Sequence, residues 1–247
     1  VCYGPPALGT PTNTLAEKSL PMKQIALLAL LVMPTPAALA AADGTQTYSL
    51  GTVALPGGGE SGISMDYIAY DRSTGYVWVP AGNTGAVDVI DTKTGKVTQI
   101  PGFPTLEVQA DTGKRLIGPS SATVGRGVVY VGNRADKSVT AVDARKLTRG
   151  TSVKLDAMPD GLAYVAATNE VWVTTPRDKS IRVLDAATLA EKAKLSFDGE
   201  PEGFAVDAKR GRFYTNLEDA DLRGAKLARS SFTRANLARA NLAGADL

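Results

Sequence analysis

Apolar and polar residues alternate in short runs along the middle of the chain. Four runs carry an aromatic residue at a matched place, and these residues, Trp78, Tyr130, Trp172 and Tyr214, lie 52, 42 and 42 positions apart. A period of two with β-branched and aromatic side chains predicts β-strands. Gly, Asn, Asp and Pro separate the runs as turn residues do. The pattern predicts a repeated antiparallel unit of about 42 residues.

Each repeat unit is expected to hold four strands. In the third copy they are predicted at 162–165, 171–174, 181–185 and 193–197. The same pattern predicts strands at 67–70, 76–79, 86–91 and 96–100 in the first copy, and at 121–124, 128–131, 138–143 and 151–155 in the second. About ten extra residues around 103–114 are predicted to be an insertion between two units. The fourth copy stops after its second strand.

The third strands end in similar short motifs, Val-Ile-Asp91-Thr-Lys-Thr-Gly, Val142-Asp143-Ala-Arg-Lys-Leu and Leu184-Asp185-Ala-Ala-Thr-Leu. With the strand–turn–strand units before them, these motifs resemble the YVTN-type (YncE-like) β-propeller family over residues 45–219. The resemblance implies an all-β fold of four-stranded antiparallel blades around a channel, with little information on activity. The closing aspartates have a structural interpretation, because Asp begins turns through side-chain-to-backbone hydrogen bonds.

The propeller is predicted to be incomplete. Three full blades and half of a fourth, about 3.5 blades, occupy 43–219, and a seven-bladed ring would need about 300 residues at this period. Residues 47–55 look like the outer strand that a propeller donates to close its ring, but this strand is expected to have no partner. Unpaired strand edges of this kind predict self-association or aggregation.

A period of five replaces the strands near the C-terminus. Residues 220–247 repeat Ala-(Asp/Asn)-Leu-x-x, with an apolar residue at 222, 227, 232, 237, 242 and 247. These units resemble the pentapeptide-repeat family, which implies a short right-handed β-solenoid. An Ala/Leu/Arg-rich helix is the alternative, although a period of five rotates successive Leu by about 140° and defines no helix face. Residues 215–219 fit both repeats, which suggests a fragment or a chimera of two genes.

The N-terminal region contains a predicted secretory signal peptide at 22–42. Met22-Lys-Gln is followed by the apolar run 25–33 and by a small-residue site, with cleavage after Ala40 or Ala42. The apolar run is shorter than the roughly 20 residues of a membrane span, so no transmembrane segment is expected after cleavage. A simple hydrophobic helix is the alternative. Residues 1–21 are interpreted as a disordered or upstream lead-in, and the mature protein is expected to be periplasmic or secreted.

Composition excludes several kinds of chemistry. The 247 residues include no His, and the one Cys, Cys2, lies before the predicted cleavage site. The mature chain would therefore lack disulfides, Cys or His catalysis, thiolate–imidazole zinc sites and CxxCH haem attachment. With 27 basic and 25 acidic residues, the net charge gives no indication of nucleic-acid binding.

Aligning the blades brings out one position that carries a carboxylate in three units. Asp66, Asp160 and Glu202 occupy it, and Ser120 replaces them in the second blade. Carboxylates around a channel mouth could bind Ca²⁺ or another divalent cation through oxygen. Turn chemistry is the alternative, since Pro-Asp-Gly is a favoured turn.

Two arginines lie in the loops between second and third strands. Arg134 and Arg177 could face an anionic ligand near the channel mouth, or they could be solvated turn charges. No nucleophile–base pair is visible in the sequence. Whether the protein is an enzyme is therefore left open, and a protein without catalytic activity is favoured.

The leading hypothesis for function is an exported propeller that binds a small ligand or a partner protein at the channel mouth. The alternative is a metal-dependent lactonase, because residues 199–204 loosely resemble the Glu-Gly motif of the gluconolactonase/SMP-30 type. A second alternative is a structural interaction protein that uses the pentapeptide solenoid.

Overall fold

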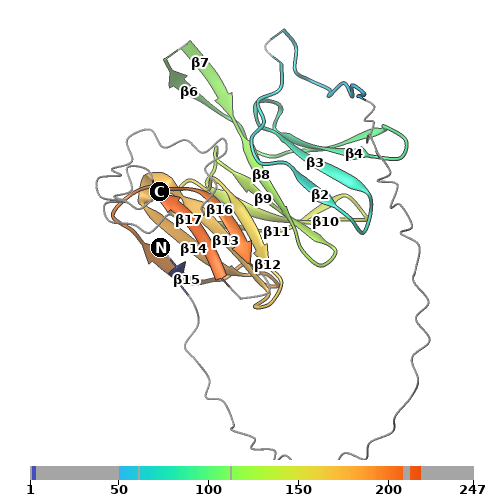
Figure 1. Ribbon diagram of the computed structural model, residues 1–247. Helices are drawn as coiled ribbons and strands as arrows, with labels where there is room; N and C mark the ends of the chain where they lie inside the picture. The colour runs from blue at the N-terminus through green and yellow to red at the C-terminus, as the bar shows by residue number, and fades with distance from the viewer. Residues whose placement is uncertain (1, 4–49, 61, 112, 208–211, 218–247) are drawn as a thin grey trace, which may run out of the picture. The chain divides into compact units, whose positions relative to one another are not determined.

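The computed structural model describes residues 2–3, 50–60, 62–111, 113–207 and 212–217 (Figure 1). The chain divides into two compact units, Val1–Pro5 with Val53–Leu247, and Pro6–Thr52. All described strands belong to the first unit. The predicted signal peptide at 22–42, with Ala40 and Ala42, and the repeats at 220–247 lie outside the described residues. None of the helices in the described ranges has the length and apolar character needed to cross a membrane.

Three four-stranded antiparallel sheets form the repeat units, and each sheet follows chain order (Figure 1). Blade 1 consists of β2 (Ala69–Asp71), β3 (Tyr76–Ala81), β4 (Ala86–Asp91) and β5 (Val97–Pro101). Blade 2 consists of β8 (Pro119–Val124), β9 (Val128–Asn133), β10 (Ser138–Asp143) and β11 (Thr148–Lys154). Blade 3 consists of β12 (Leu162–Val165), β13 (Glu170–Thr175), β14 (Ser180–Asp185) and β15 (Glu191–Ser196). The predicted all-β fold of four-stranded antiparallel blades is confirmed.

The aspartate that closes each third strand begins a turn, as predicted. Asp91 accepts a hydrogen bond from the Lys93 N–H at 2.8 Å. Asp143 accepts from the N–H groups of the residues two and three positions further on, and so does Asp185. These backbone hydrogen bonds lower the pKa of all three carboxyl groups below their ordinary value. The aspartates of the motif that carries the family resemblance therefore have a structural role, because they stabilise the turn between the third and fourth strands.

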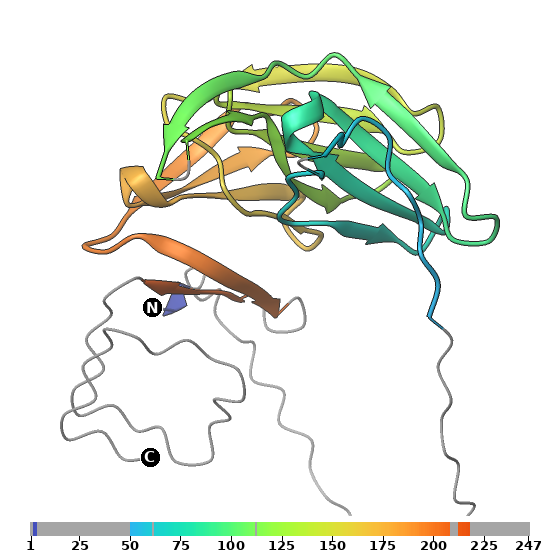
Figure 2. The same cartoon turned by 90° about the horizontal axis from the view of Figure 1, so that it is seen from above.

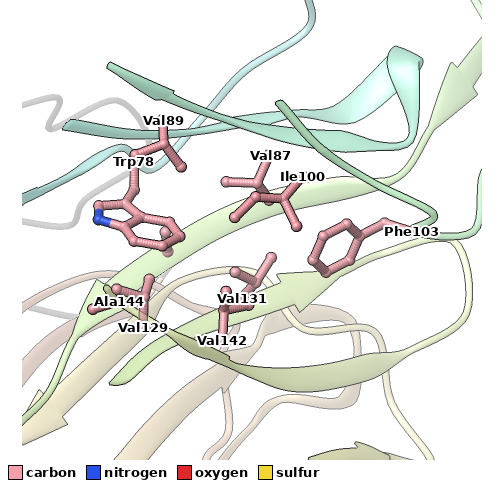
Figure 3. Packing of buried hydrophobic residues seen from close by; sticks show 10 residues of the cluster. Trp78, Val87, Val89, Ile100, Phe103, Val129, Val131, Val142 and Ala144 are labelled. Atoms are coloured by element: carbon pink, nitrogen blue, oxygen red, sulfur yellow. The ribbon is translucent and has the colours of Figure 1, made fainter. Parts of the chain in front are cut away.

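Consecutive blades bury apolar faces against one another. Figure 3 shows blade 1 and Phe103, two residues after β5, facing blade 2, with Trp78, Val87, Val89, Ile100 and Phe103 opposite Val129, Val131, Val142 and Ala144. Tyr130 and Val139 of blade 2 pack in the same way with Val171 and Val173 of blade 3. Trp78 and Tyr130, at the matched place in two second strands, thus cover valines of the next blade, which explains why the pattern repeats.

The fourth unit is half a blade, as the sequence predicts. β16 (Pro201–Asp207) pairs with β17 (Arg212–Leu217), and β1 (Cys2–Tyr3) pairs with the other edge of β17 (Figure 2). Phe213 stacks on Trp172 of blade 3 with ring centroids 4.8 Å apart. Residues 50–55, the described part of the predicted closing strand, form no strand.

The insertion between blades 1 and 2 forms a hairpin that the sequence analysis did not predict. β6 (Leu106–Ala110) and β7 (Gly113–Ile117) pair in a two-stranded sheet separate from the blades (Figure 1). Both strands are mostly exposed or half-buried, so neither shows a clear apolar face in the sequence. This hairpin supplies part of the pocket described next.

Candidate functional site

A pocket of about 330 Å³ lies among the loops that lead into first strands and the loops between second and third strands. We call it the rim pocket. Its charged lining residues are Arg115, Arg134, Arg177, Asp160, Glu200 and Glu202. Its apolar lining residues are Val108, Ile117, Met158, Pro159 and Pro176. The structure thus brings four of the six predicted site residues, Arg134, Arg177, Asp160 and Glu202, into one pocket.

Arg134 joins the first three blades at one side of this pocket. It lies in the turn after β9, and its Nη2 donates to Asp66 Oδ2 at 2.9 Å and also to Asp160 Oδ1. Its backbone N–H donates to the Gly118 carbonyl at 3.0 Å. Burial alone would lower the pKa of Arg134, but the charges of Asp160 and Asp66 raise it above the ordinary value. The guanidinium is therefore a fixed, fully charged group that two carboxylates hold in place.

Asp160 lies just before β12, where residues 158–161 form no turn although Pro-Asp-Gly predicts one. The backbone here is paired with Thr174 of β13: the Asp160 N–H donates to the Thr174 carbonyl, and the Gly161 N–H donates to Thr174 Oγ1. The carboxylate is largely buried and accepts from Arg134 instead. Pairing with β13 therefore fixes the backbone of Asp160 and Gly161, and the ion pair with Arg134 holds the carboxylate, so the predicted turn does not explain this position.

Tyr67 lies beside the same carboxylates and was not singled out in the sequence. Its N–H donates to the Ser120 carbonyl, its own carbonyl accepts from the Ala122 N–H, and its ring stacks on Phe204 with centroids 5.8 Å apart. Burial, with further contributions from Asp160, Asp66 and Glu202, raises the pKa of Tyr67 to about 12 against the opposing effect of Arg134. The phenol therefore keeps its proton at physiological pH.

Arg177 and Arg115 differ from Arg134 in their surroundings. Arg177 lies in the short 3₁₀ helix η2 (Pro176–Asp178) after β13, and Arg115 lies in β7. Both are exposed, and neither forms an ion pair with another described residue. Arg177 was predicted from its loop, whereas Arg115 and Glu200 were not, because the hairpin and the residue before β16 lie outside the matched repeat positions.

Ser120 lies outside the rim pocket, and the three predicted metal ligands do not form one ligand group. Ser120 is buried, does not line the rim pocket, and its Oγ has no hydrogen-bond partner. Within the part of the chain that the structure describes, no group of three or more Asp, Glu, His or Cys side chains could hold a metal ion. The geometry therefore does not support the predicted ligand set of Asp66, Asp160 and Glu202, because the first two face one guanidinium. The gluconolactonase-like alternative has no ligand group among these residues.

Sequence comparison identifies a family for the C-terminal part of the chain alone. Residues 215–247 match the family model "Pentapeptide repeats" in eight copies. The predicted repeat is thereby confirmed, and the match begins inside β17. No relative was found among curated proteins.

Structural comparison shows a β-propeller-like fold. A chain of Kuenenia stuttgartiensis hydrazine synthase matches with a TM-score of 0.52 at 16% identity, over 61% of this chain and 41% of that one. Apo AztD from Citrobacter koseri (TM-score 0.44, 21% identity, 64% and 40% covered) and Saccharomyces cerevisiae Sqt1 (0.48, 12%, 64% and 44%) also match. The chain spans less than half of the length of these proteins. It is a repeat protein that combines a partial propeller with pentapeptide repeats.

Proposed function

We propose that this chain is an exported repeat protein of the YVTN type whose propeller part binds a small ligand or a partner protein at the rim pocket, without catalysis. The observation that carries the proposal is the convergence of charged residues from separate segments. Arg115 comes from the β6–β7 hairpin, Arg177 from blade 3 and Glu202 from the fourth unit. Loops held on a strand scaffold are the usual place for binding residues in such folds.

Export is the second part of the proposal, and the signal-peptide pattern at 22–42 supports it. N-terminal sequencing of the protein from a secreting host tests it. The mature protein is expected to begin at Ala41 or Asp43, and retention of residues 22–40 would contradict export.

A screen that assumes no particular ligand tests the pocket. Small charged and zwitterionic compounds are added to the chain and the unfolding temperature is measured, since a ligand that binds only the folded state stabilises it. We expect at least one compound class to raise the unfolding temperature of the wild type and to lose that effect in Arg177→Gln. Arg145→Gln is the matched control, because Arg145 is exposed in the turn after β10 and does not line the pocket. Shifts that persist in Arg177→Gln, or no shift with any compound, would refute a ligand site in the rim pocket.

A further inference from the structure

Resting on the function proposed above, we propose that the rim pocket binds a zwitterion of one or two amino acid residues with an apolar side chain. The pocket combines two exposed guanidinium groups, carboxylates on a different segment, and apolar lining residues from the hairpin and from the loops of blade 3. Each of these features corresponds to one part of such a ligand.

The carboxylate of the ligand is assigned to Arg115 and Arg177. Arg134 is committed to Asp66 and Asp160, so it shapes the wall of the pocket. Arg115 and Arg177 form no ion pair among the described residues and are exposed on two separate segments, β7 and η2. Guanidinium groups bind carboxylates through paired, charge-assisted hydrogen bonds.

The ammonium group of the ligand is assigned to the side of the pocket formed by Glu200 and Glu202. These residues lie immediately before β16 and within it. The pocket carries as many carboxylates as guanidinium groups, and Asp66 contacts Arg134 just beside it. The electrostatic potential of the pocket therefore does not favour a ligand with a net negative charge. It favours a neutral ligand whose positive and negative groups are separated.

The apolar part of the ligand is assigned to Val108, Ile117 and Met158, with Pro159 and Pro176 beside them. A volume of about 330 Å³ is at the small end of ligand pockets, which span about 300–1,000 Å³. One or two amino acid residues fit this volume, whereas a long peptide or a folded partner would extend beyond it.

Calorimetric titration of the 247-residue chain with three dipeptides tests the inference. The probes are Leu-Leu, its N-acetyl form, which lacks the ammonium group, and its C-terminal amide, which lacks the carboxylate. We expect Leu-Leu to bind at millimolar concentration or below, and each modified probe to bind about tenfold more weakly, since each loses one charge-assisted contact.

Variants assign the two ends of the probe. Arg177→Gln should weaken Leu-Leu about tenfold but leave the affinity for the amide unchanged, because the amide has no carboxylate to lose. Glu200→Gln should weaken Leu-Leu and leave the N-acetyl form unchanged. Arg145→Gln should bind all probes like the wild type.

Two results overturn the inference. One is the absence of binding of Leu-Leu at millimolar concentration, and the other is equal binding of all three probes. If Leu-Leu fails while another compound stabilises the wild type but not Arg177→Gln, the inference fails and the proposed function stands. If no compound does so, both fail.

Discussion

At the scale of single residues, one matched position in the third strand of each blade carries three different polar side chains. The residue at this position is Asp88 in blade 1, Thr140 in blade 2 and Arg182 in blade 3. In each blade it pairs with a valine of the second strand, Val79, Val131 or Val173. Arg182 is only 2% exposed and pairs with Asp156 at 2.6 Å, Asp178 at 2.7 Å and Glu191 at 3.1 Å. A buried guanidinium needs such partners, because an unpaired buried charge is strongly destabilising.

This network predicts a dependence of stability on pH. Hydrogen bonds from Ser180, Arg182 and Lys194 hold the pKa of Asp178 well below its ordinary value of 3.8. A carboxyl group with a lowered pKa contributes stability above the ordinary value, and this contribution is lost as the pH falls through the folded pKa. The free energy of unfolding is therefore expected to decrease below about pH 4, and Asp178→Asn should make that decrease smaller.

Urea denaturation between neutral pH and about pH 3 measures the effect. Asp198→Asn is the control, because Asp198 is exposed and its carboxylate forms no ion pair with a described residue. An equal acid dependence in the wild type and in Asp178→Asn would show that the network does not contribute.

At the scale of elements, the join between the hairpin and blade 2 depends on a close approach of two backbones. A Cβ at Gly118 would lie 2.2 Å from the carbonyl oxygen of Gly82, in the 3₁₀ helix η1 (Gly82–Thr84) of blade 1. Because the obstacle is backbone, one segment has to move. Gly118→Ala is expected to destabilise the fold by about 1–3 kcal/mol.

The same substitution should also affect ligand binding, because the Gly118 carbonyl accepts the hydrogen bond from the Arg134 N–H. Denaturant unfolding measures the stability change, with Gly51→Ala as the control, since a Cβ at Gly51 would meet nothing within 4 Å. Equal stability of the two variants would contradict a tight join.

The strands of the three blades could be predicted because burial of one or both blade faces imposes an alternation of apolar and polar residues along each strand. The hairpin β6–β7 could not be, because it packs outside the repeat and leaves Leu106 and Leu116 exposed. The same distinction holds for the site. Asp160, Glu202 and Arg134 occupy repeat positions and were found by alignment, whereas Arg115 lies on the hairpin and Tyr67 shows its role only through stacking on Phe204. The ion pairs of Arg134 with carboxylates from blades 1 and 3 join residues far apart in the sequence, so no local sequence pattern predicts them.

At the scale of the whole molecule, two repeat architectures share residues. β17 ends at Leu217, and the pentapeptide match begins at residue 215, so Thr215 and Leu217 serve a propeller strand and a pentapeptide unit at once. The Thr215 hydroxyl donates to the Gly203 carbonyl of β16, which fixes this residue in the half-blade. The partial propeller therefore extends into the first pentapeptide unit.

The partial propeller also leaves part of one face of blade 1 exposed. Val129 and Val131 of blade 2, and Val171 and Val173 of blade 3, are fully buried by the preceding blade. In blade 1 the matching Val79 is also buried, at 3% exposure, but on the same face Tyr70 is 54% exposed and Ile68, just before β2, is 56% exposed. Exposed apolar faces and open sheets promote association with other chains.

The 247-residue chain is therefore expected to self-associate at micromolar concentration, and Ile68→Ser combined with Tyr70→Ser should lower its mean mass toward that of a monomer. Size-exclusion chromatography with light scattering measures this over a range of concentrations. Leu106→Ser is the matched control, because it removes an apolar side chain of similar exposure from the hairpin and leaves the face of blade 1 intact. A wild-type chain that stays monomeric at all concentrations would show that this face does not drive self-association. An equal effect of Leu106→Ser would show that the association does not depend on this face.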